Sequence, residues 1–208
     1  HKSQEELEML ARKKVKHLYL GIESGLDDVL KFMKKDHDLA QAYQAIDRLH
    51  EAGLIYDAHI MTGVAGKGRG MENAEALAQF LNRTNPAHVV NFSMFLHKEV
   101  PLYQDIRQGT FVPADELETI REEYHLIERI APEKAGANIL YDGFHDFIHV
   151  RVRGHLPGDK EKMLAKLNGI IQEYEGKEPV YSFVQGECPD LEYCDDGKAV
   201  WDMDRKTS

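Results

Sequence analysis

Cysteine is scarce in this chain of 208 residues, which has only Cys188 and Cys194. So few cysteines exclude a disulfide-stapled scaffold and are typical of a reducing compartment, which predicts a cytoplasmic protein. Five residues separate the two, and no second pair of ligands accompanies them, so they match no zinc-binding pattern. We therefore interpret them as free thiols.

Long apolar runs and an excess of positive charge are also lacking. No stretch is long enough to span a bilayer, and no signal-peptide pattern is present. The formal net charge of −10 argues against non-specific binding to nucleic acids or to membrane surfaces. Apolar residues make up 42% of the chain and charged residues 30%, as is ordinary for a globular protein.

What the chain does have is a conspicuous stretch from Leu18 to Gly25, LYLGIESG. An apolar run bounded by turn residues is typical of a buried strand. This one ends in Glu23 and Ser24, and the carboxyl ends of parallel strands are where α/β folds bind ligands. A carboxylate there can accept hydrogen bonds from a ribose diol. The alternative is structural, with Glu23 paired to a nearby lysine and Ser24 capping a helix.

Strand-like and helix-like segments alternate along the first part of the chain. Strands are predicted at 15–22, 55–61 and 88–95, with amphipathic helices between and after them. Three such units predict an α/β fold with a parallel sheet, amounting to about half of an eight-stranded TIM-like barrel. Half a barrel leaves open strand edges, so we expect either missing sequence or a second copy of the chain to cover them.

The pattern changes after Gly136. Residues 147–153 alternate as a half-buried strand does, and a helix is predicted to start near Pro157. We therefore divide the chain into a partial barrel, 1–132, and a small C-terminal α+β extension, 133–208. His145 and His149 are four positions apart in this strand-like region, where that spacing does not suit a metal, and are interpreted as surface or interface residues.

A second candidate ligand site is the glycine-rich loop from Gly63 to Gly70, which includes Gly66. Glycines let a backbone approach a ligand closely and can present N–H groups to an anion. The loop matches neither a P-loop nor a Rossmann fingerprint, and a flexible crossover remains the alternative. His59 and His97 lie near the ends of the second and third strands and are placed for ligand contact, although an ordinary polar role is open for both.

Taken in order, several segments resemble the radical SAM superfamily, in the branch that includes elongator catalytic subunits, methylthiotransferases and oxygen-independent coproporphyrinogen oxidases. They are LYLGIESG, LDDVLKFMKKDH, EAGLIYDAHIMTGVAG and VPLYQDIRQGTF. The resemblance implies a partial α/β barrel that binds S-adenosylmethionine (SAM) and a 4Fe–4S cluster at the carboxyl ends of its strands. It implies SAM contacts for Glu23 and Ser24. Lys35 stands where the branch usually has an arginine that meets the SAM carboxylate.

The superfamily's cluster motif, CxxxCxxC, is absent from the sequence. We therefore expect the chain, which begins with His1, to be the C-terminal half of a radical SAM enzyme, with the cluster-binding N-terminal half as its missing partner. The fragment alone is expected to hold neither cluster nor SAM and to be inactive. Two alternatives remain: a cluster-free binding or regulatory module on the same scaffold, and an unrelated phosphate-binding α/β-barrel enzyme.

Overall fold

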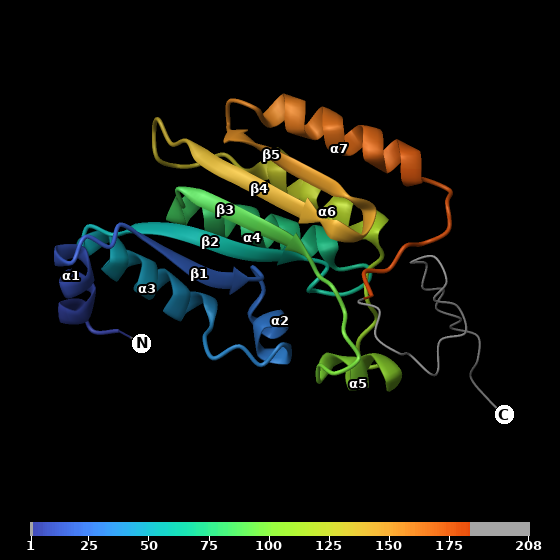
Figure 1. The fold of residues 1–208 in the computed structure, drawn as a ribbon, viewed down its shortest axis with the longest axis horizontal. Coiled ribbons are helices and arrows are strands. Elements are labelled where there is room, and N and C mark those ends of the chain that lie inside the picture. Colours follow the sequence, from blue (N-terminus) through green and yellow to red (C-terminus); the bar gives the residue numbers. More distant parts are fainter. Residues whose placement is uncertain (1, 184–208) are drawn as a thin grey trace.

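A five-stranded sheet forms the centre of the protein in the computed structural model, which describes residues 2–183 (Figure 1). Its strands lie in sequence order: β1 His17–Glu23, β2 Ile55–Thr62, β3 His88–Ser93, β4 Ile139–His145 and β5 Val150–Leu156. β1 to β4 are parallel, and β5 pairs antiparallel with β4. The α/β class predicted from the sequence is confirmed.

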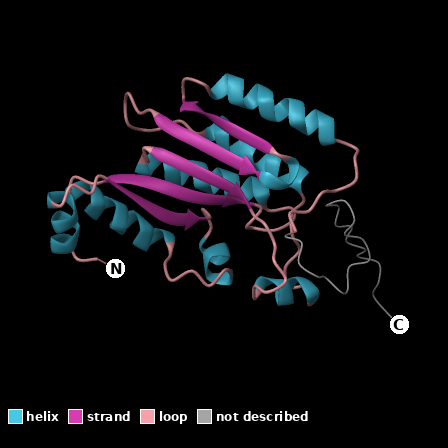
Figure 2. Cartoon of the chain, viewed as in Figure 1, coloured by secondary structure: helices cyan, strands magenta, loops and turns pink. Residues whose placement is uncertain are grey.

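Helices, drawn in cyan in Figure 2, precede, connect and follow the strands. They are α1 Gln4–Arg12, α2 Asp27–Phe32, α3 Leu39–Glu51, α4 Gly70–Thr84, α5 Leu102–Arg107, α6 Glu116–Arg129, α7 Lys160–Tyr174 and the short 3₁₀ helix η1 Asp146–Ile148. Within residues 2–183, no helix has both the length and the apolar character needed to cross a membrane.

Local sequence signals set several helix ends. The N-cap residue of α3 is Asp38, whose side chain accepts a hydrogen bond from the Gln41 N–H while the Gln41 side chain accepts one from the Asp38 N–H. The helix is followed by Gly53 at a φ of 74°, as expected for a glycine after a helix. α2 has Leu26 as its N-cap residue and no side-chain cap, although Asp27 follows it. The Asp27 carboxylate accepts from the Leu39 N–H at 2.8 Å and so contacts the start of α3.

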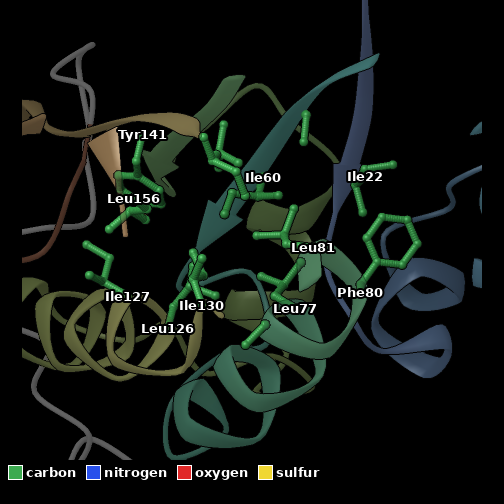
Figure 3. Packing of buried hydrophobic residues seen from close by; sticks show 14 of the residues in the cluster. Ile22, Ile60, Leu77, Phe80, Leu81, Leu126, Ile127, Ile130, Tyr141 and Leu156 are labelled. Atoms are coloured by element: carbon green, nitrogen blue, oxygen red, sulfur yellow. The ribbon is translucent and has the colours of Figure 1, made fainter. Parts of the chain in front are cut away.

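The main core lies between one face of the sheet and the helices. Alternate strand residues point into it, among them Ile22, Ile60, Tyr141 and Leu156, and they meet α4 and α6 residues including Leu77, Phe80, Leu81, Leu126, Ile127 and Ile130 (Figure 3). In Figure 1 the two helices lie behind the sheet. Burial of this apolar surface is the main force that holds the helices on the sheet.

The opposite face of the sheet is more open. One row of rings crosses it: Tyr19 lies 4.9 Å from His59, His59 6.0 Å from Phe92, and Phe92 5.6 Å from Phe144 between ring centroids. The guanidinium of Arg151 lies over the Phe144 ring at 4.7 Å. Tyr19 remains 49% exposed. This row therefore forms a surface that other groups can reach.

The region after residue 132 differs from the prediction. A fourth parallel strand, β4, was not foreseen, and the next strand begins at Val150 rather than at residue 147. The sequence of β4 contains Asp142 and Gly143, two residues that strands disfavour. In the structure Asp142 on β4 is paired with Arg151 on β5, and these two strands extend the same sheet. The division of the chain into a partial barrel, 1–132, and a C-terminal extension, 133–208, stays a prediction.

Near the end of the described residues, a single bridge pairs Phe183 with Leu96, which follows β3. Residues 184–208, which include Cys188 and Cys194, lie outside the described residues. The prediction of two free thiols therefore stays a prediction.

Candidate functional site

Glu23 occupies an unusual turn at the carboxyl end of β1. Its φ is 62°, in the left-handed region, and the Ser24 N–H donates to the Ile22 carbonyl at 2.7 Å, closing a three-residue turn around it. The pairing of β1 with β2 shifts register between Gly21 and Glu23. A non-glycine residue in such a turn costs of order 1–3 kcal/mol, and such strain gathers at functional sites.

Lys35 lies opposite this carboxylate. Its Nζ donates to Glu23 Oε1 at 3.0 Å, and the two side chains are 31% and 23% exposed. The structural alternative for Glu23, pairing with a lysine, is thus what the structure shows, and the lysine is the residue that the resemblance placed beside SAM. Gly21 leaves room for the pair, because a Cβ at that position would lie 2.7 Å from Glu23 Oε1 and 3.8 Å from Lys35 Nζ. A hollow of about 360 Å³ borders Gly21 and Lys35.

Ser24 is fully buried, and its hydroxyl is already engaged. It donates to Asn73 Oδ1 at 2.6 Å and accepts from the Leu26 N–H at 3.1 Å. Ser24 therefore anchors the turn beside Glu23. The SAM contact expected for Ser24 stays a prediction.

The loop after β2 contacts α6 and its own backbone. Gly63 donates from its N–H to Glu122 Oε2 at 2.8 Å, and Gly68 donates to Glu118 Oε1 at 3.3 Å. The Gly66 and Lys67 N–H groups donate to the carbonyls of Gly63 and Val112, respectively. These N–H groups are used internally, and two of them face carboxylates, which disfavours binding of a phosphate by this loop.

The two candidate histidines occupy different environments. His59 belongs to the ring row on the open face of the sheet, next to Tyr19. His97 follows β3, and its Nδ1 accepts from the Glu99 N–H at 3.2 Å. Among the predicted site residues, the structure brings Glu23 and Lys35 together and links Ser24 to Gly63 through Asn73 on α4 and Glu122 on α6. The ring contacts of His59 and the hydrogen bond of His97 involve other residues than the Glu23–Lys35 pair.

His145 is not the surface residue that the sequence predicted. It is fully buried, with Nδ1 2.9 Å from Glu116 Oε2 and Nε2 2.9 Å from Glu123 Oε2. Burial alone would lower the pKa of His145, but the charge of Glu123 and the hydrogen bonds to both carboxylates outweigh it and raise the pKa to about 10. His145 is therefore a buried imidazolium, whereas His149 is exposed as predicted.

The two carboxylates around His145 have further donors. Glu116 accepts from the hydroxyls of Ser93, Thr119 and Ser182. Glu123 accepts from Asn91 Nδ2 at 3.1 Å and from the Tyr141 hydroxyl at 3.0 Å. This buried cluster lies between α6 and the sheet and stabilises their packing.

Apolar periodicity favours Leu117 and Tyr124 as buried positions of α6, and for this reason sequence reasoning missed the cluster. Glu116 and Glu123 are buried, and Leu117 and Tyr124 are half-buried. The available signal was the spacing: Glu116, Ile120, Glu123 and Ile127 recur at helical intervals, so two carboxylates share the apolar stripe. Carboxylates on a core-facing stripe need buried partners.

Comparison with known proteins identifies the segment that carries the Glu23–Lys35 pair. Residues 2–81 match the model of the radical SAM superfamily. These residues, which make up less than half of the chain, are similar to that superfamily. The chain is also 25% identical over 119 residues to the tRNA uridine(34) acetyltransferase of Methanocaldococcus infernus, covering 57% of this chain and 22% of that protein. The predicted resemblance to the elongator-like branch is confirmed.

The fold of this chain is also found in a solved structure. The archaeal Elp3 of Methanocaldococcus infernus with an N-terminal deletion superposes with a TM-score of 0.58 and 17% identity, over 86% of this chain and 41% of that one. The chain thus spans less than half of the solved relative and about a fifth of the curated one.

The two radical SAM cofactors fit the described residues differently. The space beside Gly21 and the pair of Glu23 carboxylate and Lys35 ammonium suit SAM, which carries a ribose diol and a carboxylate. Residues 2–183 contain no cysteine, and no cluster of three metal-ligating side chains occurs among them. They do not fit a 4Fe–4S cluster, which proteins hold with thiolates.

Proposed function

We propose that this chain supplies the SAM-binding edge of a radical SAM enzyme whose cluster ligands lie outside residues 2–183. The observation that carries the proposal is the strained turn at the end of β1, which presents the Glu23 carboxylate beside Lys35. Because ionised groups make the strongest hydrogen bonds, a carboxylate and an ammonium at one strand end form an effective site for a polar cofactor.

Glu23 and Lys35 both lie in this chain, so the proposal includes measurable SAM binding by the chain alone, which differs from the expectation drawn from the missing cluster motif. Each residue of the pair has a role. Glu23 accepts hydrogen bonds from the two ribose hydroxyls, and Lys35 turns from Glu23 to the SAM carboxylate. Lysine provides the charge without the bidentate fork of arginine, so this contact is a single-point one. A 4Fe–4S cluster, held by ligands outside residues 2–183, would supply the electron for SAM cleavage.

The open face of the sheet is proposed to face the substrate. In a closed barrel the ring row from Tyr19 to Phe144 lines the interior, near the SAM site. The similar Methanocaldococcus protein is named for a tRNA uridine. Since fold does not fix substrate and the chain spans only 22% of that protein, the substrate of this chain is left open.

The free edge of β1 is the proposed contact for a partner. Among the described strands β1 pairs only with β2, so its other edge has unpaired backbone groups. We propose that the cluster-bearing N-terminal half covers this edge, and that in its absence a second copy of the chain does so.

The proposed SAM site predicts that Lys35→Gln weakens SAM binding at least about 10-fold, the value of one charge-assisted hydrogen bond. Lys34→Gln is the matched control, because Lys34 is the exposed neighbour of Lys35 and forms no part of the pair. Calorimetry with SAM measures both variants and the unmodified chain. Equal affinities in all three would contradict the proposal, and tighter binding of a phosphorylated sugar than of SAM would favour the phosphate-binding alternative.

The location of the cluster ligands gives a second prediction. After anaerobic reconstitution with iron and sulfide, the chain is expected to remain colourless, to hold no 4Fe–4S cluster and to leave SAM intact. Visible absorbance from iron–sulfur charge transfer measures cluster content, and chromatography of SAM and its products measures cleavage. A brown preparation that cleaves SAM on reduction would show that the chain binds a cluster by itself.

A further inference from the structure

The turn that presents Glu23 is held by a chain of buried hydrogen bonds. Asn73 Oδ1 on α4 accepts from the Ser24 hydroxyl at 2.6 Å and from the Gly25 N–H at 3.1 Å. Asn73 Nδ2 in turn donates to Glu122 Oε1 on α6 at 2.7 Å. Glu122 Oε2 accepts from the Gly63 N–H at 2.8 Å, so this one carboxylate joins the ends of β1 and β2.

The direction of every bond in this chain is fixed. The Gly25 N–H can only donate, so the Asn73 carbonyl must face it and the Asn73 NH₂ must face Glu122. The Gly63 N–H can also only donate. Glu122 therefore has to accept at both oxygens, which the ionised carboxylate does and an amide or a protonated carboxyl does less well.

We propose that Glu122 and Asn73 are positioning residues, which hold the strained turn so that Glu23 points at its ligand. The inference rests on the proposed SAM site and extends it to two buried residues that do not touch the ligand. Without the clamp, Glu23 can relax to an ordinary backbone conformation, which removes a strain of order 1–3 kcal/mol and moves its carboxylate away from Lys35.

The charge state of Glu122 links this clamp to pH. Burial raises the pKa of Glu122 to about 7, although the hydrogen bonds from Asn73 and the Gly63 N–H oppose the shift. The charged groups that act on it are Glu118 on its own helix and His145 on β4, while Asn73 and Gly63 face it as neutral donors. His145 keeps its proton well above pH 7, whereas Glu122 titrates near neutrality.

The test compares SAM affinity at pH 6, 7 and 8 in the unmodified chain, in Glu122→Gln and in the control Glu128→Gln, whose side chain is exposed on the same helix. We expect the affinity of the unmodified chain to fall at least five-fold from pH 8 to pH 6 as Glu122 takes up a proton. Glu122→Gln should bind at least five-fold more weakly at pH 8 and lose the pH dependence, whereas Glu128→Gln should match the unmodified chain.

Amide hydrogen exchange provides a readout that needs no ligand. Exchange at Gly25 and Gly63 should speed up in Glu122→Gln and in the unmodified chain at pH 6, after correction for intrinsic rates. If SAM does not bind the unmodified chain, the proposed function fails, and the exchange data still decide whether the clamp exists. A Glu122→Gln variant that loses stability but keeps the affinity, the pH profile and the exchange rates would overturn the inference.

Discussion

Replacing His145 with alanine is expected to lower the free energy of unfolding by about 3–5 kcal/mol, because two buried carboxylates lose the cation between them. Glu116 and Glu123 are at most 1% exposed, and each has one oxygen 2.9 Å from a nitrogen of this ring. Since domains are stable by only about 5–15 kcal/mol, the variant should be close to unfolding at room temperature. Urea denaturation followed by circular dichroism measures the change.

His149→Ala is the matched control. His149 lies four residues further on and is exposed, so its replacement should change the free energy of unfolding by less than about 0.5 kcal/mol. Equal effects of the two substitutions would contradict the description of His145 as a buried imidazolium.

The pH dependence of the unmodified chain tests the same cluster if His145→Ala does not fold. The pKa of His145 is about 10 in the folded protein and 6.5 in its ordinary state. Its stabilisation is therefore complete below pH 6.5 and is lost as the pH rises toward 10, by about 4–5 kcal/mol at most. A free energy of unfolding that rises across this range would contradict this assignment.

Gly25→Ala is expected to destabilise the protein by about 3 kcal/mol, because the added methyl group would meet the backbone of α4. A Cβ at this position would lie 2.5 Å from the Ala76 carbonyl carbon and 2.7 Å from the Ala76 Cβ. Backbone atoms in a packed helix cannot move aside as the end of a flexible side chain can. Denaturant unfolding measures the loss, and SAM binding should weaken with it because the Gly25 N–H belongs to the Asn73 clamp.

Gly169→Ala should have the opposite sign. Gly169 lies in the interior of α7 with open space around a would-be Cβ, so alanine should stabilise the helix by about 0.5–1 kcal/mol. If both substitutions change the free energy of unfolding in the same direction, the close approach of Gly25 to α4 does not explain why position 25 is a glycine.

Much of the parallel sheet could be predicted from sequence because its strands are short apolar runs bounded by turn residues. β1, β2 and β3 lie within two residues of their predicted bounds. β4 was not predicted because its Asp142 and Gly143 are determined by contacts with other elements rather than by strand propensity. A Cβ on Gly143 would overlap the Glu123 carboxylate, so this glycine makes room for a buried side chain of the preceding helix, α6.

The candidate site was predictable to the same degree. Glu23 and Lys35 were identified from the sequence, because a polar strand end and the family resemblance pointed to them. Asn73 and Glu122 were not, since each lies within a helix and has an ordinary sequence context. Their role depends on two helices and two strand ends meeting in space, which a pattern in one helix does not reveal.

The central claim is that SAM binds at the carboxyl end of β1, and a nuclear magnetic resonance titration of the ¹⁵N-labelled chain with SAM tests it most directly. The account predicts that the amide signals of Glu23, Lys35 and Gly63 shift together along one binding curve. The signals of Gly53 and Asn85 should stay in place, because these two residues line a hollow at the opposite end of the sheet, where β2 and β3 begin. Shifts confined to that opposite end of the sheet, or no shift at millimolar SAM, would contradict it.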